Sequence, residues 1–380
     1  MSYHPLPESI GELEEQVLEA WEVEDTFHRS LELRRDAPEF VFYEGPPTAN
    51  GRPGVHHLLP RTIKDTVARF RAMTGWHVTR MAGWDTHGLP VEIEAEKMLG
   101  ISGKPEIEEL GIARFNQVCR ENLFTYKEDW ERLSRRIGYW LDYENAYVTC
   151  TPDYIESVWW ALAEIHRKGL VYKGYKVLPY CPRCGTGLSS HEVAQGYRVV
   201  SEPSVYVKFR LEDDEGGASI LSWTTTPWTL PGNVALAVGE DIEYLRVRLR
   251  EPRDGEGGFP KGASPGEELI VASALAPDVL RHPYDVVQVV PGSDLVGRRY
   301  RPLFPGAVEA DGDPAAWTVL PADFVTIADG TGVVHTAVMY GEDDFKLGTR
   351  EGLPMQHTVD PDGRFVDRVP GGLAGRFVKD

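Results

Sequence analysis

Apolar residues in the first hundred positions alternate between short runs and stripes with helical spacing. They recur every three or four positions over 7–30 and 61–73, which is typical of helices, whereas residues 40–43 form a short apolar run. The predicted order is helix 7–30, strand 40–43, helix 61–73, strand 76–82 and helix 91–99. Because strands alternate with helices, we expect an α/β fold with a parallel, doubly wound sheet.

The pattern changes in the second half of the chain. Helical spacing continues over 105–138 and 153–168, but after residue 199 short apolar runs are separated by Gly, Pro and acidic turns. This texture predicts a β-rich domain. We therefore expect two domains, 1–198 and 199–380, with a Gly- and Pro-rich surface loop over 251–268. The expected strands of the second domain are 205–209, 220–223, 234–238, 244–249 and 286–290.

Composition and charge narrow the class of protein. The 380 residues are 42% hydrophobic and 26% charged, and no apolar run reaches the roughly 18 residues of a membrane span. The acidic N-terminus does not resemble a secretory signal, so we expect a cytoplasmic protein with no membrane partner. A net charge of −19 argues against broad binding to phosphate backbones. Two basic clusters are either local nucleic-acid contacts or simply solvated side chains: Arg132, Arg135 and Arg136, and Arg298, Arg299 and Arg301.

Polar residues follow the two predicted strands of the first domain, where parallel sheets bind ligands. Small residues and prolines after residue 44 lead to His56 and His57 at the start of the next helix, where imidazoles can donate to phosphate. Asp85 follows the second strand and can hold an ammonium group, or it can simply cap a helix. These loops predict a site for a charged ligand.

A second group of polar residues lies in the β-rich half. Thr224, Thr225 and Thr226 are adjacent, and buried hydroxyls need partners, so they suit a polar pocket better than a core. His335 and Asp344 come from a distant segment, and the alternative is that all of these residues only form turns. The combination predicts a hydrolytic pocket for a small substrate.

Two of the four cysteines, Cys181 and Cys184, form a Cys-Pro-Arg-Cys sequence that is typical of half a zinc site. Tetrahedral zinc needs four ligands, and Cys119 and Cys150 stand alone. His191 is one candidate for a third ligand. We expect Zn²⁺ here, in a site that is incomplete within these residues.

Three motifs together carry a resemblance to a known family. They are Gly-Pro-Pro-Thr-Ala-Asn-Gly over 45–51, Gly-Trp-Asp-Thr-His-Gly-Leu-Pro-Val-Glu over 83–92 and Trp-Thr-Thr-Thr-Pro-Trp-Thr-Leu-Pro over 223–231. The combination resembles the isoleucyl-tRNA synthetases, a branch of the class I aminoacyl-tRNA synthetases, over nearly the whole chain. The resemblance implies the first half of a Rossmann-type catalytic domain, interrupted by an inserted β-barrel editing domain.

The resemblance also implies roles in adenylate formation. Pro46 and Asp85 would hold isoleucine, with Asp85 pairing its α-ammonium, while Asn50, Gly54 and His57 would face ATP with Mg²⁺ on the phosphates. The family pattern His-x-Gly-His departs here, since Gly54 replaces its first histidine and His56 replaces its glycine. We expect His56 and His57 together to meet the phosphates from a rearranged backbone.

For editing, the resemblance implies that the threonines and Asn233 line a pocket that His335 shapes. Asp344 would bind the α-ammonium of a misattached valine while water attacks the ester. Val338 replaces the family's proline, so we expect an altered lining.

The resulting hypothesis is a monomeric isoleucine–tRNA ligase that uses ATP, isoleucine and tRNA(Ile) and edits valyl-tRNA. No Lys-Met-Ser-Lys-Ser-like loop occurs, so we expect a truncated piece that cannot aminoacylate alone. Two alternatives stay open: a stand-alone deacylase that clears mischarged tRNA, and a non-catalytic paralogue that binds tRNA or nucleotide.

Overall fold

The computed structural model describes residues 9–214, 216–251, 262–310 and 312–380, and they form two compact units, 1–174 and 175–380. Residues 175–198, which the sequence groups with the first domain, thus belong to the second compact unit. The functional boundary at 198/199 stays a prediction. Among the described residues, no helix combines the length and apolar character needed to cross a lipid bilayer.

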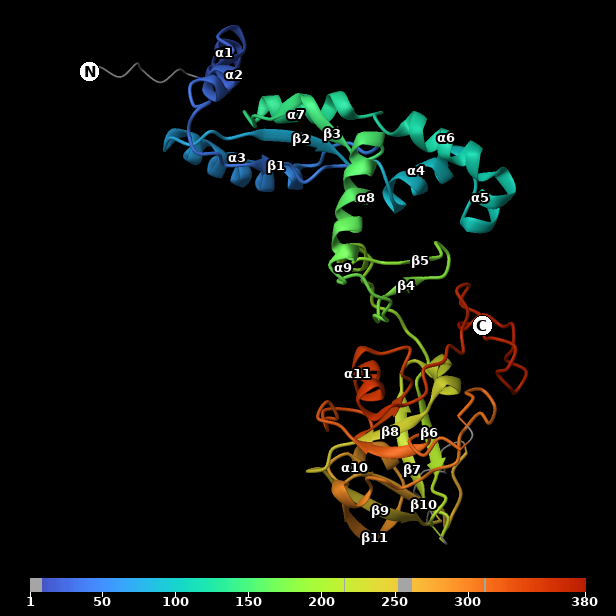
Figure 1. Ribbon diagram of the computed structural model, residues 1–380. Coiled ribbons are helices and arrows are strands. Elements are labelled where there is room, and N and C mark those ends of the chain that lie inside the picture. Colours follow the sequence, from blue (N-terminus) through green and yellow to red (C-terminus); the bar gives the residue numbers. More distant parts are fainter. Residues whose placement is uncertain (1–8, 215, 252–261, 311) are drawn as a thin grey trace. The chain divides into compact units, whose positions relative to one another are not determined.

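The first unit is an α/β unit around a three-stranded parallel sheet, β1-β2-β3 (Figure 1). This confirms the parallel sheet predicted from the alternation of strands and helices. Its helices and strands are α1 (Ile10–Val23), α2 (Thr26–Glu32), β1 (Phe42–Tyr43), η1 (Val55–His57), α3 (Leu58–Met73), β2 (Arg80–Trp84), α4 (Leu89–Leu99), α5 (Lys104–Leu110), α6 (Ile112–Asn122), α7 (Lys127–Arg136), β3 (Asp142–Val148) and α8 (Pro152–Arg167).

Several predicted bounds in the first unit were wrong, for identifiable reasons. The helix expected over 7–30 is broken at Asp25, which has a positive φ of 50°. The pattern over 105–138 is three helices, because Gly111 (φ 97°) separates α5 from α6 and residues 123–126 separate α6 from α7. Gly83 lies within β2 rather than ending a strand at 82. A Cβ there would lie 2.2 Å from the Tyr147 ring, so only glycine fits.

The second unit is β-rich, as predicted. A five-stranded sheet has the order β11-β9-β10-β7-β6 and a three-stranded sheet has the order β12-β8-β13. Its helices and strands are β4 (Tyr180–Cys181), β5 (Thr186–Gly187), α9 (Ser190–Gln195), β6 (Val205–Arg210), β7 (Ser219–Thr224), η2 (Pro227–Gly232), β8 (Ala235–Val238), β9 (Glu243–Leu249), β10 (Glu268–Ala272), α10 (Ala276–Leu280), β11 (Tyr284–Pro291), η3 (Gly292–Asp294), β12 (Thr318–Pro321), β13 (Val333–Thr336) and α11 (Glu342–Glu351).

The main core of the second unit lies between these sheets. Phe209, Ile220, Leu236, Tyr244 and Ile270 are all buried in one cluster. Isolated bridges at Leu211–Tyr300 and Arg299–Thr318 run between the two sheets. Closure of the sheets into a barrel stays a prediction. Most of the loop expected over 251–268 lies outside the described residues, and Glu268 is not in a surface loop but begins β10.

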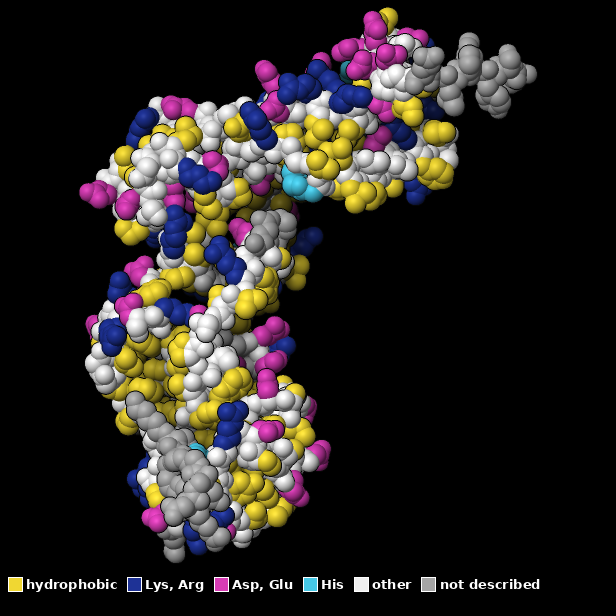
Figure 2. All heavy atoms as spheres, turned by 180° about the vertical axis from the view of Figure 1, so that it is seen from behind, with side chains coloured by type: hydrophobic (Ala, Val, Ile, Leu, Met, Phe, Trp, Pro, Cys, Tyr) yellow, Lys and Arg dark blue, Asp and Glu magenta, His cyan; other side chains and the backbone are white. Residues whose placement is uncertain are grey.

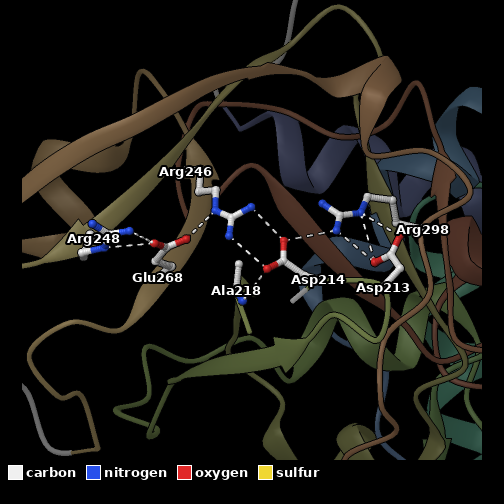
Figure 3. Close-up of polar contacts among 7 residues, drawn as sticks. All are labelled: Asp213, Asp214, Ala218, Arg246, Arg248, Glu268 and Arg298. Carbon is white, nitrogen blue, oxygen red and sulfur yellow. Dashed lines mark hydrogen bonds and ion pairs between the residues drawn. The ribbon is translucent and has the colours of Figure 1, made fainter. Parts of the chain in front are cut away.

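Glu268 is buried, and its charge is compensated within a chain of charged side chains (Figure 3). Both terminal nitrogens of Arg246 donate hydrogen bonds to the carboxylate of Asp214, at 2.8 and 2.9 Å, and its Nε donates one to Glu268. Arg298 pairs with Asp213 and Asp214 at the other end. Burial alone would raise the pKa values of Asp214 and Glu268. The arginine partners outweigh this effect and lower both pKa values, and at Asp214 a hydrogen bond from the Ala218 N–H adds to the lowering.

Candidate functional site

A cavity of about 290 Å³ in the second unit brings the predicted polar residues together. Its wall includes Thr224, Thr225 and Thr226 at the end of β7, His335 on β13 and Asp344 in the first turn of α11. The volume is at the small end for ligand sites, which start near 300 Å³. The cavity therefore fits a ligand of about the size of one amino acid.

The threonines mark the point where β7 turns into η2. The Thr226 N–H donates to Thr224 Oγ1 at 3.1 Å, and the two hydroxyl oxygens lie 3.3 Å apart. Thr224 is buried while Thr225 and Thr226 are exposed, so hydroxyl groups run from the wall to the mouth of the cavity. These groups can donate to or accept from a small polar ligand.

His335 is a buried wall residue whose tautomer follows from its contacts. The Thr229 hydroxyl donates its single hydrogen to the Thr226 carbonyl at 2.8 Å, so it can only accept from His335 Nε2, 3.1 Å away. The proton of the neutral ring is therefore on Nε2. His335 Nδ1 has no hydrogen-bond partner among the described residues. Burial lowers the pKa of His335 to about 4, so the ring is neutral at physiological pH.

Asp344 is the acidic group of the cavity that comes from a helix start. Its Oδ1 accepts from the Ala337 N–H at 3.0 Å, which ties α11 to the end of β13. Burial raises the pKa of Asp344 to about 6, although the N–H groups of Ala337 and of its own backbone oppose the shift. A carboxylate that is costly to charge in this position is suited to pairing with a cationic ligand group.

Asn233, which was also predicted to line the pocket, is not among the lining residues. Its Nδ2 donates to the Ala235 carbonyl at 2.9 Å and its Oδ1 accepts from the buried Tyr300 hydroxyl at 2.7 Å. Both groups of the amide are used to hold the start of β8. A role for Asn233 in ligand binding stays a prediction.

In the first unit, the loops after β1 and β2 lie together. Thr48 and Asp85 form a parallel bridge, and the Asp85 N–H donates to the Pro47 carbonyl at 3.0 Å, next to Pro46. Asn50 is buried and its Nδ2 donates to the Pro90 carbonyl at 2.8 Å. The two loops thus form one structure at the carboxyl ends of neighbouring strands, as the sequence predicts.

His56 and His57 form η1 at the start of α3, with ring centroids 3.9 Å apart. His57 Nδ1 accepts from the Gly54 N–H at 2.9 Å, so the neutral ring carries its proton on Nε2 as a donor. Burial, followed by the neighbouring His56 and Arg61, lowers the pKa of His57. A Cβ at Gly54 would lie 2.7 Å from the His56 ring, which explains why glycine accompanies a histidine at position 56.

The family follows from a comparison with known proteins. A family model described as tRNA synthetases class I (I, L, M and V) matches residues 16–282, which is most of the chain. The chain belongs to this family. The comparison confirms the resemblance inferred from the motifs.

The most similar relatives include isoleucine–tRNA ligases of clostridia and bacilli. That of Clostridium novyi (strain NT) is 48% identical over 97% of this chain and 33% of the relative. That of Bacillus thuringiensis (strain Al Hakam) is 49% identical over 98% of this chain and 34% of the relative. The synthetase chain thus spans about a third of the length of the curated relatives it matches.

Solved structures give weaker similarities, to parts of leucyl-tRNA synthetases. The crystal structure titled GlLeuRS-CP1 has a TM-score of 0.31 and 18% identity, over 39% of this chain and 59% of that one. The cytosolic leucyl-tRNA synthetase editing domain of P. knowlesi has a TM-score of 0.30 and 12% identity, over 39% of this chain and 64% of that one. These values are too low to establish a shared fold.

Cys181 and Cys184 of this synthetase chain lie on the β4–β5 hairpin. The Gly185 N–H donates to the Cys181 carbonyl at 2.9 Å, which forms the tight turn, and burial raises the pKa of the Cys184 thiol. In the described part of the chain, no group of three or more His, Cys, Asp or Glu could hold a metal ion. The side chain of His191 lies outside the described residues. Two thiols are half a tetrahedral set, so zinc stays a prediction.

Sequence reasoning missed several residues that line the cavity of the second unit, among them Thr229, Asp329, Thr331 and Tyr340. Thr229 lies within the threonine-rich motif, so the motif itself was the available signal. Asp329 and Thr331 flank Gly330 just before β13, and the strand was not predicted. Tyr340 gave no signal in the sequence, because an aromatic residue beside glycine is ordinary in a turn.

Proposed function

We propose that this chain is the part of an isoleucine–tRNA ligase that binds the adenylate and edits valyl-tRNA. The observation that carries the proposal is the meeting of Thr226, His335 and Asp344 around one small cavity. Thr226 is about a hundred residues away from the other two in the sequence, and the relatives at 48–49% identity are isoleucine–tRNA ligases.

The editing step is hydrolysis of the ester between valine and the terminal ribose of tRNA. Asp344 pairs with the α-ammonium, and the threonine hydroxyls orient the ester. Water attacks the carbonyl carbon, the C–O bond to the ribose breaks, and the products are valine and a free ribose hydroxyl. A neutral His335 forms a wall that adds no charge beside the α-ammonium.

A separate editing site is needed because a single binding pocket discriminates poorly between isoleucine and valine. Isoleucyl-tRNA synthetase is itself the usual example of this limit, since one missing methylene is worth only about 1–3 kcal/mol in a hydrophobic pocket. A cavity of about 290 Å³ supports the proposal because it suits a ligand of the size of one amino acid, and the editing role requires that it admit valine and reject isoleucine.

For activation, Pro46 and Asp85 hold isoleucine while Asn50 and His57 face ATP. The isoleucine carboxylate attacks the α-phosphorus of ATP, the bond from this phosphorus to the oxygen bridging to the β-phosphate breaks, and pyrophosphate leaves. Mg²⁺ would neutralise the phosphates. The Nε2–H of His57 supports this assignment, because it supplies a donor at the start of a helix, where phosphate binds well.

Deacylation of valyl-tRNA(Ile) by the 380-residue chain tests the proposal. We expect release of valine above the uncatalysed rate, and loss of that release in Asp344→Ala. Asp343→Ala is the matched control, since Asp343 is a neighbouring carboxylate on the same helix but does not line the cavity. Equal rates for the two variants, or none for the unaltered chain, would contradict the proposal.

A further inference from the structure

A hollow lined mainly by arginine lies on α7 of the first unit, and it includes Arg132 and Arg136, for which the sequence left nucleic-acid contact and simple solvation open. It has a volume of about 580 Å³, and its lining residues are Arg52, Pro53, Asp129, Arg132, Leu133 and Arg136. The α7 residues are spaced by three, one and three positions, which places them on one face of the helix. Arg52 comes from the loop that precedes η1.

The hollow carries an excess of positive charge on a chain whose net charge is −19. Three guanidinium groups face a single lining carboxylate, Asp129, which pairs with Arg132 and, at 3.9 Å, with Arg52. Arg136 pairs with Glu14 of α1 at 2.9 Å. The side chains of Arg52 and Arg132 are more than three quarters exposed, and such exposed pairs exchange readily for another anion. Figure 2 shows Lys and Arg side chains gathered over α7.

The backbone that carries these arginines is anchored on the other side of α7. Trp130 Nε1 donates to the Gly51 carbonyl at 2.8 Å, and the Trp130 ring packs against His57 with centroids 4.6 Å apart. Arg52 follows Gly51 directly, so the loop places the Arg52 backbone close to α7, while its exposed side chain is free to turn toward a ligand.

We propose that this hollow binds backbone phosphates of tRNA. The inference rests on the proposed function, because it takes tRNA as the partner. Arginine is suited to phosphate, since its planar fork can donate two hydrogen bonds to one phosphate group. The guanidinium groups of Arg132 and Arg136 on one helix face, together with that of Arg52 from the adjacent loop, match successive phosphates better than they match one nucleotide. The lining has no aromatic ring on which a base could stack, which argues against ATP as the ligand.

The test compares two double variants of the full 380-residue chain. R52A/R132A removes two guanidinium groups from the hollow. R35A/R167A removes two guanidinium groups from elsewhere in the same unit. Both side chains are exposed, and each pairs with a glutamate three positions earlier in the chain, Arg35 with Glu32 and Arg167 with Glu164. Binding of a tRNA transcript is measured by fluorescence anisotropy over a series of salt concentrations, and circular dichroism checks that both variants are folded.

We expect R52A/R132A to weaken binding at least tenfold near 0.1 M salt, and to lower the slope of log K against log salt by about 1–2. The control should bind within about twofold of the unaltered chain. Equal weakening in both variants, or in neither, would overturn the proposal. If millimolar ATP displaces the transcript from the unaltered chain but not from R52A/R132A, the ligand of the hollow is a nucleotide, and the proposal is overturned as well.

The outcomes separate this inference from the proposed function. If the unaltered chain does not bind the transcript, the hollow is not an RNA site, whatever the deacylation assay shows. If R52A/R132A binds normally while Asp344→Ala abolishes deacylation, only the assignment of the hollow fails. If the transcript binds through the hollow but valyl-tRNA is not hydrolysed, the editing proposal fails and this one stands.

Discussion

His335 Nε2 lies 3.1 Å from Thr229 Oγ1, and the hydroxyl of Thr229 has already given its hydrogen to a carbonyl. The pair fixes which nitrogen of a buried imidazole carries the proton. It also joins η2, which follows the threonine run, to β13, which lies about a hundred residues later in the chain. One hydrogen bond thus sets both the geometry of the cavity wall and the tautomer of its histidine.

The first prediction concerns the protonation of His335. Because burial lowers its pKa to about 4, we expect the ring to remain neutral, with the proton on Nε2, from pH 5.5 upward as a rough limit. Nitrogen-15 NMR of labelled histidine measures both facts. Thr229→Ser should keep the Nε2–H form, whereas Thr229→Val removes the acceptor and should mix the two tautomers. Titration of His335 with a midpoint above pH 6 would contradict the assignment.

The same residue makes stability depend on pH. The unfolded imidazole binds a proton near its ordinary pKa and the folded one does not, so the stability is fully present above about pH 6.5 and is lost as pH falls toward 4. Between pH 7 and pH 5 we expect His335 to cost roughly 2 kcal/mol of unfolding free energy. Urea unfolding of the chain and of His335→Gln at both pH values isolates this share. An equal pH dependence in both proteins would refute it.

Asp344 should act in the opposite direction within the same cavity. Its pKa rises to about 6 on folding, so folding favours the protonated acid and this contribution is lost as pH rises from about 4 to 6. Asp344→Asn keeps an acceptor for the Ala337 N–H but never ionises. We expect it to stabilise the fold at pH 7 by roughly 1–2 kcal/mol and to have almost no effect near pH 4. Destabilisation at pH 7 would show that the carboxylate is not strained by burial.

The sequence was sufficient to predict the fold class of each unit, but not which face of a helix packs against the rest of the unit. The apolar stripe of Ile63, Val67 and Phe70 correctly predicts a helix, yet all three side chains are exposed. The buried face of α3 carries Arg61 instead, whose guanidinium lies 5.0 Å from the centroid of the Trp130 ring and donates to Ser134. Periodicity reports a helix, whereas the side that packs depends on partners distant in the sequence.

The candidate site shows the same division. The resemblance to the family implied that His335 and Asp344 share a pocket with the threonines, and all of these residues line the cavity. Asn233 lies two residues after the threonine-rich motif, but its side-chain oxygen accepts from Tyr300, which no local pattern connects with it. Strands β12 and β13 were missed because each has only four residues and both are buried against β8, so neither shows a regular alternation of apolar and polar side chains.

The charged chain of β9 and β10 should make the second unit sensitive to acid. The Asp214 side chain is 5% exposed and pairs with Arg246 and Arg298, so Asp214→Asn would leave partly buried guanidinium donors unmatched. Because both guanidinium groups are only partly buried, we expect a loss of about 2 kcal/mol at pH 7, below that of a fully buried pair. The lowered pKa of Asp214 means that this stability is present above about pH 4 and is lost as pH falls further.

Hydrogen exchange of the β9 and β10 amides measures this loss within the second unit alone. Asp285→Asn is the control, because Asp285 is 68% exposed and forms a single pair with Arg250. We expect no measurable change in its exchange rates, since exposed pairs contribute little. Similar changes in both variants would mean that the buried network has no special role.

Gly332 should tolerate no side chain, although it is only one residue from β13. Its φ is 72°, and a Cβ there would lie 2.4 Å from the Cβ of Ala272 on β10. Its carbonyl also accepts from the buried Tyr244 hydroxyl at 2.7 Å, so the backbone cannot move away without breaking that bond. We expect Gly332→Ala to cost about 2–4 kcal/mol and to disturb the cavity wall that includes His335.

Gly352→Ala separates steric overlap from backbone strain. Gly352 has nearly the same φ, 68°, but no atom lies within 4 Å of the added Cβ, so its substitution should cost only about 1 kcal/mol. Thermal unfolding of the two variants gives the difference, and valyl-tRNA deacylation shows whether the cavity is still formed. If Gly332→Ala is no worse than Gly352→Ala, the strand that carries His335 has room to shift against β10, and the wall of the cavity is less rigid than its contacts indicate.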